Sequence, residues 1–260
     1  MYQTIAVETD DRGVATLWLD RDEKHNALSG RMIAEIHAAA DALAADDAVR
    51  AVILAARGRS FCAGGDLGWM RAQFEAAPDE RNRQAATLAH MLGALNALPK
   101  PLIARVQGNC FGGGVGMVAV CDIAIGVDGL RMALTETRLG LIPATIGPYV
   151  AARMGEAKAR RVFFTGRSFD AAEAVQLDLL SRAVPAEALD DAIAAEVDPV
   201  LDTAPGAVAR AKRLLRHLGP PITPELVDHS VAELAACWDS AETQEGIGAF
   251  FRKEKPSWQR

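Results

Sequence analysis

The sequence predicts an α/β fold, and two observations lead to this prediction. Short apolar runs typical of buried strands alternate with segments of helical apolar spacing through the first two-thirds of the 260-residue chain. From residue 203 onward the strand-like runs disappear, and only helical patterns remain. We therefore expect an α/β domain over residues 1–202 and a helical C-terminal region over residues 203–260.

Four segments predict the strands. Residues 13–19 (GVATLWL) follow a turn with the sequence DDRG, and residues 51–55 (AVILA) form a continuous apolar run. Residues 101–106 (PLIARV) and 122–127 (DIAIGV) have the same apolar, β-branched character. Helical patterns separate these runs, which indicates mixed α/β architecture and not an all-β fold.

Helical patterns and helix-end signals occupy most of the remaining chain. Pro78 interrupts the second pattern, Gly155 follows the end of the third, and Asp170 with Glu173 has the spacing of a capping box. Helices are expected over residues 29–45, 66–98 with that interruption, 148–154, 205–218 and 224–251.

Composition excludes several functional classes. The net charge of −6 argues against nucleic acid or an anionic membrane as a partner, and no apolar run reaches the ~20 residues of a membrane span. The N-terminus lacks the features of a signal peptide. The four cysteines match no metal-binding spacing, and a chain of this size needs no disulfides. We expect a cytoplasmic protein with reduced thiols and no metal.

Two glycine-rich segments are the candidates for chemistry. Residues 60–70 (SFCAGGDLGWM) and residues 108–116 (GNCFGGGVG) each follow a predicted strand and precede a helix. Glycine lets the backbone approach a ligand closely, and a helix start leaves N–H groups without acceptors. Two such segments could direct two N–H donors at one oxygen, as in an oxyanion hole. The alternative is that the glycines serve only turns and packing.

Six segments in order along the chain resemble the enoyl-CoA hydratase/isomerase family, also called crotonases. They are residues 19–28 (LDRDEKHNAL), 60–67 (SFCAGGDL), 108–125 (GNCFGGGVGMVAVCDIAI), 136–143 (ETRLGLIP), 164–174 (FTGRSFDAAEA) and 245–253 (EGIGAFFRK). The resemblance implies a crotonase spiral of ββα units with a helical C-terminal trimerisation region. It also implies an acyl-CoA thioester substrate with no separate cofactor, because coenzyme A is part of the substrate. In motif detail the chain is similar to bacterial methylglutaconyl-CoA hydratase-like proteins.

The same resemblance assigns roles to individual residues. Gly65 and Gly113 match the two glycines whose N–H groups hold the thioester oxygen. Phe250 and Lys253 match residues that contact coenzyme A from a neighbouring subunit of a homotrimer or hexamer. The remaining positions implied to bind coenzyme A are Lys24, Ala27, Ala63, Asp66, Leu67 and Gly68. Arg21, Lys24, Arg57, Arg59 and Lys255 could add positive charge for the phosphates, or could simply be solvated surface charges.

Glu136 matches one of the family's two catalytic glutamates, and the resemblance implies that it moves a proton at the thioester. Without that context, an acidic residue near a helix start would suffice to explain it. The second glutamate is absent, because Gly116 occupies its position. A hydratase that uses two glutamates to activate water would lack one here.

Three functions remain open at this point. The first is hydration of a 2-enoyl-CoA, perhaps with a branched or carboxylated acyl group. The second is isomerisation of a 3-enoyl-CoA to a 2-enoyl-CoA by Glu136 alone. The third belongs to another class: a protein that binds coenzyme A or RNA with little catalysis, although the net negative charge argues against RNA.

Overall fold

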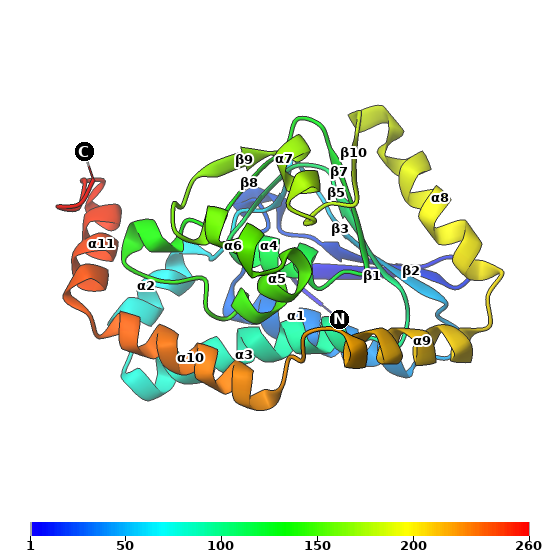
Figure 1. Ribbon diagram of the computed structural model, residues 1–260, viewed down its shortest axis with the longest axis horizontal. Coiled ribbons are helices and arrows are strands. Elements are labelled where there is room, and N and C mark those ends of the chain that lie inside the picture. Colours follow the sequence, from blue (N-terminus) through cyan, green and yellow to red (C-terminus); the bar gives the residue numbers. More distant parts are fainter. Residues whose placement is uncertain (1, 260) are drawn as a thin grey trace.

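The computed structural model describes residues 2–259 and contains two sheets surrounded by helices (Figure 1). The larger sheet has the strand order β1-β2-β3-β5-β7-β10, and the smaller sheet has the order β4-β6-β8-β9. The strands are β1 Ile5–Thr9, β2 Val14–Leu19, β3 Ala51–Ala56, β4 Ser60–Cys62, β5 Leu102–Val106, β6 Asn109–Phe111, β7 Ile123–Val127, β8 Arg131–Ala133, β9 Ser168–Asp170 and β10 Arg182–Val184.

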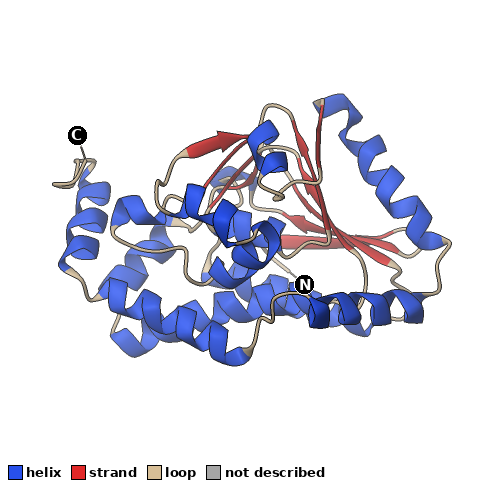
Figure 2. Cartoon of the chain, viewed as in Figure 1, coloured by secondary structure: helices blue, strands red, loops and turns tan. Residues whose placement is uncertain are grey.

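Helices cover the sheets on several sides, and α8 packs against the larger sheet (Figure 2). The α-helices are α1 Gly30–Ala45, α2 Leu67–Glu75, α3 Pro78–Ala97, α4 Gly113–Ala119, α5 Gly147–Met154, α6 Glu156–Phe163, α7 Ala171–Gln176, α8 Leu189–Leu201, α9 Pro205–Leu218, α10 Pro224–Trp238 and α11 Ala241–Arg252. Three short 3-10 helices are η1 Asp22–Lys24, η2 Glu136–Leu139 and η3 Ala186–Ala188.

A ββα unit repeats along the middle of the chain. In each unit the first strand (β3, β5 or β7) joins the larger sheet, the next strand (β4, β6 or β8) joins the smaller sheet, and a helical segment follows. Equivalent strands of successive units pair in parallel. The repeat places the starts of the following helical segments near one another, and this is where the candidate site lies.

The predicted α/β class and the main elements are confirmed. The four predicted strands correspond to β2, β3, β5 and β7, and the interruption at Pro78 separates α2 from α3. One helix prediction is wrong, because the segment predicted over residues 224–251 is two helices, α10 and α11. The Ser240 side chain accepts a hydrogen bond from the Thr243 N–H at 3.1 Å and begins a new helix there.

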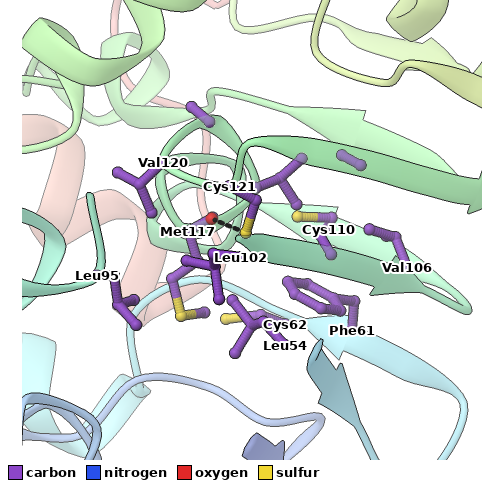
Figure 3. Packing of buried hydrophobic residues seen from close by; sticks show 14 of the residues in the cluster. Leu54, Phe61, Cys62, Leu95, Leu102, Val106, Cys110, Met117, Val120 and Cys121 are labelled. Carbon is purple, nitrogen blue, oxygen red and sulfur yellow. Dashed lines mark hydrogen bonds between the residues drawn. The ribbon is translucent and has the colours of Figure 1, made fainter. Parts of the chain in front are cut away.

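Three of the four cysteines lie in the apolar core between the sheets and α4 (Figure 3). Cys62, Cys110 and Cys121 are fully buried and form no disulfide. Burial raises the pKa of Cys62 and of Cys121 to about 12, and it raises the pKa of Cys110 well above its ordinary value. At neutral pH these thiols are protonated, so they act as small core side chains.

The C-terminal helices lie over the α/β domain. In Figure 1, α10 runs beside α3. Helix α11 contacts η2. The Thr243 hydroxyl donates to the Gly140 carbonyl at 2.7 Å, which ties α11 to the turn that ends η2. No helix within residues 2–259 is both long enough and apolar enough to cross a membrane.

Candidate active site

One small cavity brings Gly65, Gly113 and Glu136 together. Its volume is about 140 Å³, and it lies among the loop before α1, helices α2, α3 and α10, the start of α4 and the chain after η2. Larger cavities, of about 820, 640, 420 and 170 Å³, are lined by none of the predicted site residues. We therefore locate the candidate active site in the small cavity.

Two backbone N–H groups in this cavity have no acceptor. Gly113 is the first residue of α4, so its N–H has no partner within the helix. Gly65 lies between two groups that already bond to Leu28: the Leu28 N–H donates to the Gly64 carbonyl at 2.7 Å, and the Asp66 N–H donates to the Leu28 carbonyl at 2.9 Å. Neither glycine N–H donates a hydrogen bond within residues 2–259, so both are available to a ligand.

The second of these donors depends on glycine. A Cβ atom on Gly113 would lie 2.6 Å from Leu28 Cδ1, well inside van der Waals contact. The preceding Gly112 has a φ of +49°, a region that favours glycine. The backbone conformation therefore favours glycine at position 112, and a side chain on residue 113 would require the end of the Leu28 side chain to move.

The carboxyl group of Glu136 is buried beside this turn. It begins η2, and a Cβ atom on Gly112 would lie 3.2 Å from its Oε1. Burial raises the pKa of Glu136 to about 7, and a hydrogen bond from its own backbone N–H opposes this shift only weakly. Its Oε2 is buried and has no hydrogen-bond partner within the described residues. A carboxyl group in this state can both accept and donate a proton near neutral pH.

The space for a second carboxylate is filled. A Cβ atom on Gly116 would lie 2.4 Å from Ile146 Cγ2 and 2.8 Å from Ile146 Cβ. Among the described residues that line the cavity, Glu136 is the only acidic one. The site therefore has one carboxylate, and an isoleucine stands near where the other would begin.

The two segments predicted to bind coenzyme A lie side by side. The Ala63 N–H donates to the His25 carbonyl at 3.0 Å, which adds to the two hydrogen bonds of Leu28. Ala27 is buried between the segments. The other predicted positions there, Lys24, Ala63, Leu67 and Gly68, are exposed to solvent. Phe250 and Lys253 lie on and just after α11 and do not line the cavity.

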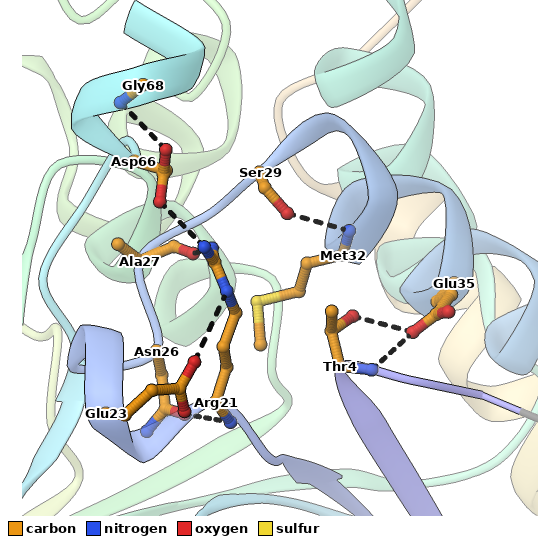
Figure 4. Close-up of polar contacts among 10 residues, drawn as sticks. All are labelled: Thr4, Arg21, Glu23, Asn26, Ala27, Ser29, Met32, Glu35, Asp66 and Gly68. Atoms are coloured by element: carbon orange, nitrogen blue, oxygen red, sulfur yellow. Dashed lines mark hydrogen bonds and ion pairs between the residues drawn. The ribbon is translucent and has the colours of Figure 1, made fainter.

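Asp66 and Arg21 hold these segments in place (Figure 4). Asp66 Oδ1 accepts from the N–H groups of Gly68 and Trp69, capping α2, while Arg21 Nη2 donates to Asp66 Oδ2 at 2.9 Å. Burial alone would raise the pKa of Asp66, but these hydrogen bonds and the Arg21 charge lower it below its ordinary value. Arg21 Nη1 also donates to the Ala27 carbonyl at 3.0 Å. The guanidinium thus links the loop before α1 to the residue that follows Gly65.

Several residues at the site were not identified from the sequence. Asn26 is fully buried and bonds to the carbonyls of Arg57 and Ser60, fixing the loop before α1. Gln73, Arg81 and Trp238 line the cavity from three different helices. Helical spacing was the only available signal: Trp69 with Gln73, Arg81 with Ala85, and Leu234 with Trp238 are each four residues apart on one helix face.

Comparison with known proteins agrees with this geometry. The model of the enoyl-CoA hydratase/isomerase family matches residues 9–260. An enoyl-CoA hydratase structure from Shewanella pealeana is 36% identical, covers 99% of this chain and 97% of its own, and superposes with a TM-score of 0.82. One from Mycobacterium smegmatis is 35% identical, with coverages of 98% and 99% and a TM-score of 0.80.

A third solved structure, an enoyl-CoA hydratase from Mycobacterium avium, is 30% identical with a TM-score of 0.85 over the whole of both chains. The expected crotonase fold is thereby confirmed. The family model covers every strand except most of β1, together with the cavity and the C-terminal helices. The chain therefore belongs to the enoyl-CoA hydratase/isomerase family and is an enzyme of that family.

Proposed function

We propose that the protein hydrates a 2-enoyl-CoA thioester through an enolate, and that it acts as a hydro-lyase. The observation that carries the proposal is the shared cavity: two N–H groups without acceptors and one buried carboxyl group all line it. The N–H groups of Gly65 and Gly113 would bind the thioester oxygen. They would stabilise it most strongly when it becomes negative, because charge-assisted hydrogen bonds are stronger than neutral ones.

A single carboxylate can complete this reaction. Ionised Glu136 takes a proton from water while the water oxygen bonds to C3, and the electron pair of the double bond moves to the thioester oxygen. Protonated Glu136 then returns the proton to C2, and the enolate collapses to the 3-hydroxyacyl thioester. A pKa of about 7 suits both steps, because neither protonation state is strongly disfavoured near neutral pH. The similar solved structures described above are enoyl-CoA hydratases, which also supports hydration.

Isomerisation of a 3-enoyl-CoA is the second candidate, and the contact between Gly116 and Ile146 favours it. Glu136 would remove a proton from C2 to give a dienolate, and would return that proton to C4. No water is consumed, so the missing second carboxylate would cost this reaction nothing. The cavity of about 140 Å³ is smaller than the ~300 Å³ typical of small-molecule sites, which favours a short or branched acyl group in either reaction.

The experiment that separates these functions uses a 2-enoyl-CoA and the matching 3-enoyl-CoA. A hydratase gives the 2-enoyl thioester the mass of one water, with the oxygen label of the solvent. An isomerase moves the double bond of the 3-enoyl thioester without a change of mass. The control is Glu136→Gln, which keeps the shape of the side chain. If wild type and Glu136→Gln were equally inactive on all thioesters but bound them, the protein would be a coenzyme A-binding module.

Assembly and location form part of the same proposal. Exposed apolar residues on α9, namely Leu214, Leu215 and Leu218, would suit burial in a homotrimer or in a hexamer made of two trimers. A neighbouring subunit would then bring Phe250 and Lys253 to the coenzyme A. The buried, unpaired thiols suit a cytoplasmic protein. We propose no nucleic-acid or membrane partner.

A further inference from the structure

Two polar side chains line the otherwise largely apolar acyl cavity at a distance along the chain from the catalytic residues. Arg81 comes from the first turns of α3, and Gln73 comes from α2. The Arg81 side chain is 10% exposed and Gln73 is 7% exposed. Buried polar side chains are almost always paired, because an unpaired one forfeits its hydrogen bonds to water.

These two side chains have unused hydrogen-bonding capacity. The Gln73 amide makes no hydrogen bond within residues 2–259. Arg81 Nη2 donates to Asp239 Oδ1 at 2.9 Å, while its other nitrogens have no acceptor in that part of the chain. A guanidinium group carries five N–H donors, so most of them remain available.

Asp239 leaves much of the Arg81 charge uncompensated. The Asp239 side chain is 65% exposed, and an ion pair with such a solvated partner contributes little. The guanidinium carbon lies 5.7 Å from the centre of the Trp238 ring, which holds the group over α10 beside the cavity. The cavity therefore offers a fixed positive charge and an amide to whatever the acyl group carries.

We propose, resting on the proposed function, that Arg81 and Gln73 select a short acyl group that ends in a carboxylate. Arginine matches the planar geometry of a carboxylate, and its charge suits an anion in a cavity that is mostly shielded from water. A plain alkyl chain would leave the Gln73 amide and most of the Arg81 donors without partners, and a site built for hydrogen bonds discriminates strongly against such a substrate. Gln73 donates to the same carboxylate through its amide nitrogen.

The test compares the binding of two saturated acyl-CoA thioesters, so that it does not depend on turnover. One carries a terminal carboxylate, and the other carries the carboxamide of the same acyl group, which has the same shape without the charge. Calorimetry gives the ratio of the two dissociation constants. We expect wild type to prefer the carboxylate by about 10²-fold, and Arg81→Gln to lose this preference while binding the carboxamide almost unchanged. Arg81→Lys should retain part of it, because lysine keeps the charge but not the paired donors.

Asp239→Asn is the matched control. It breaks the same ion pair between α3 and α10 but leaves the Arg81 charge in the cavity. If Arg81 binds the carboxylate of the acyl group, Asp239→Asn keeps or increases the preference for the carboxylate thioester over the carboxamide thioester. If Arg81 merely fastens α10 to α3, both variants weaken the two thioesters equally, and the proposal is overturned. A wild-type ratio near one also overturns it.

Turnover is measured separately with the unsaturated forms of the same two thioesters. Failure of wild type to convert either one counts against the proposed function but leaves the binding ratio as the test of Arg81. Circular dichroism and thermal unfolding of each variant establish that it is folded before its ratio is used.

Discussion

Ile146 fills the space into which a side chain on Gly116 would extend, with its Cγ2 only 2.4 Å from the position of a Cβ there. Glycine at position 116 of α4 and isoleucine at position 146 after η2 are thus sterically dependent on each other, because Ile146 leaves no space for a larger residue at position 116. We expect Gly116→Glu to be destabilised, by about 1–3 kcal/mol for the overlap and more for the buried charge. Thermal unfolding measures the loss.

Room can be made for that glutamate by shortening Ile146. The variant Gly116→Glu with Ile146→Ala should regain part of the stability. It should also hydrate a 2-enoyl-CoA faster than Ile146→Ala alone, since a second carboxylate could hold the water. A Gly116→Glu protein with the unfolding temperature of wild type would show that Ile146 does not restrict this position.

The N–H of Gly113 can be removed while the space around it is kept. Leu28→Ala relieves the contact at 2.6 Å, and proline is well tolerated at the first position of a helix. We expect Gly113→Pro in the Leu28→Ala background to lower kcat by about 10²–10³-fold, the usual effect of losing one such donor. Gly113→Ala in the same background keeps the N–H and should retain the activity of Leu28→Ala. Equal rates for the two double variants would rule out Gly113 as a donor to the substrate.

Glu136 sets the expected pH dependence of the reaction. In the proposed reaction its ionised form takes the first proton, and burial raises its pKa to about 7. The value of kcat/KM should therefore rise with pH through about 7 and level off above it. Glu136→Gln should abolish most of the activity at every pH, whereas Glu187→Gln, an exposed carboxyl group away from the site, should reproduce the wild-type profile. A profile that is flat from about pH 5 to about pH 9, roughly two pH units on either side of this pKa, would contradict this role.

The same carboxyl group should lower the stability of the folded protein at alkaline pH. In the folded state its pKa is about 7, against an ordinary value of 4.5, so the folded protein binds more protons between these values than the unfolded chain does. The contribution of Glu136 to stability is therefore complete below about pH 4.5 and is lost as the pH rises through 7. Glu136→Gln should be more stable than wild type by up to about 3 kcal/mol at pH 8, with little difference near pH 4.5. Urea unfolding at the two pH values measures this difference, and an equal difference at both would refute it.

Thiol labelling tests the core packing. We expect no more than one thiol per native chain to react, and we expect that thiol to be Cys237, because the other three are buried and protonated. All four should react in denaturant. Native Cys237→Ser should be inert, and rapid labelling of this variant would indicate that the core opens readily.

The elements that could be predicted from sequence are those whose signal is local. Every residue of the strand β3 is apolar because the strand lies in the core, and Pro78 marks the start of α3 because proline is well tolerated in the first turn of a helix. The strands of the smaller sheet have three residues each, too few to show a two-residue period. The break between α10 and α11 was missed because Asp239 and Ser240 continue the polar face of a helix, so only the Ser240 cap marks it.

The residues of the candidate site likewise include some that could be predicted from local sequence and some that could not. Gly65, Gly113 and Glu136 lie within distinctive motifs, and the structure places them around one cavity. Gln73 and Arg81 lie on ordinary amphipathic helices, where a polar residue is usually solvated. Which of them faces a cavity depends on how α10 crosses α3, a contact between segments far apart in the chain, about which local spacing says nothing.

The position of α10 also affects how acyl preference could be transferred between related enzymes. Leu234 and Trp238 form part of the cavity wall, while Glu136, Gly65 and Gly113, the residues proposed to carry the reaction, all precede residue 203. A chimera that exchanged only residues 1–202 would inherit the reaction but would keep the part of the cavity wall that α10 supplies. Reprogramming this enzyme for another acyl group therefore requires α2, α3 and α10 to be exchanged together.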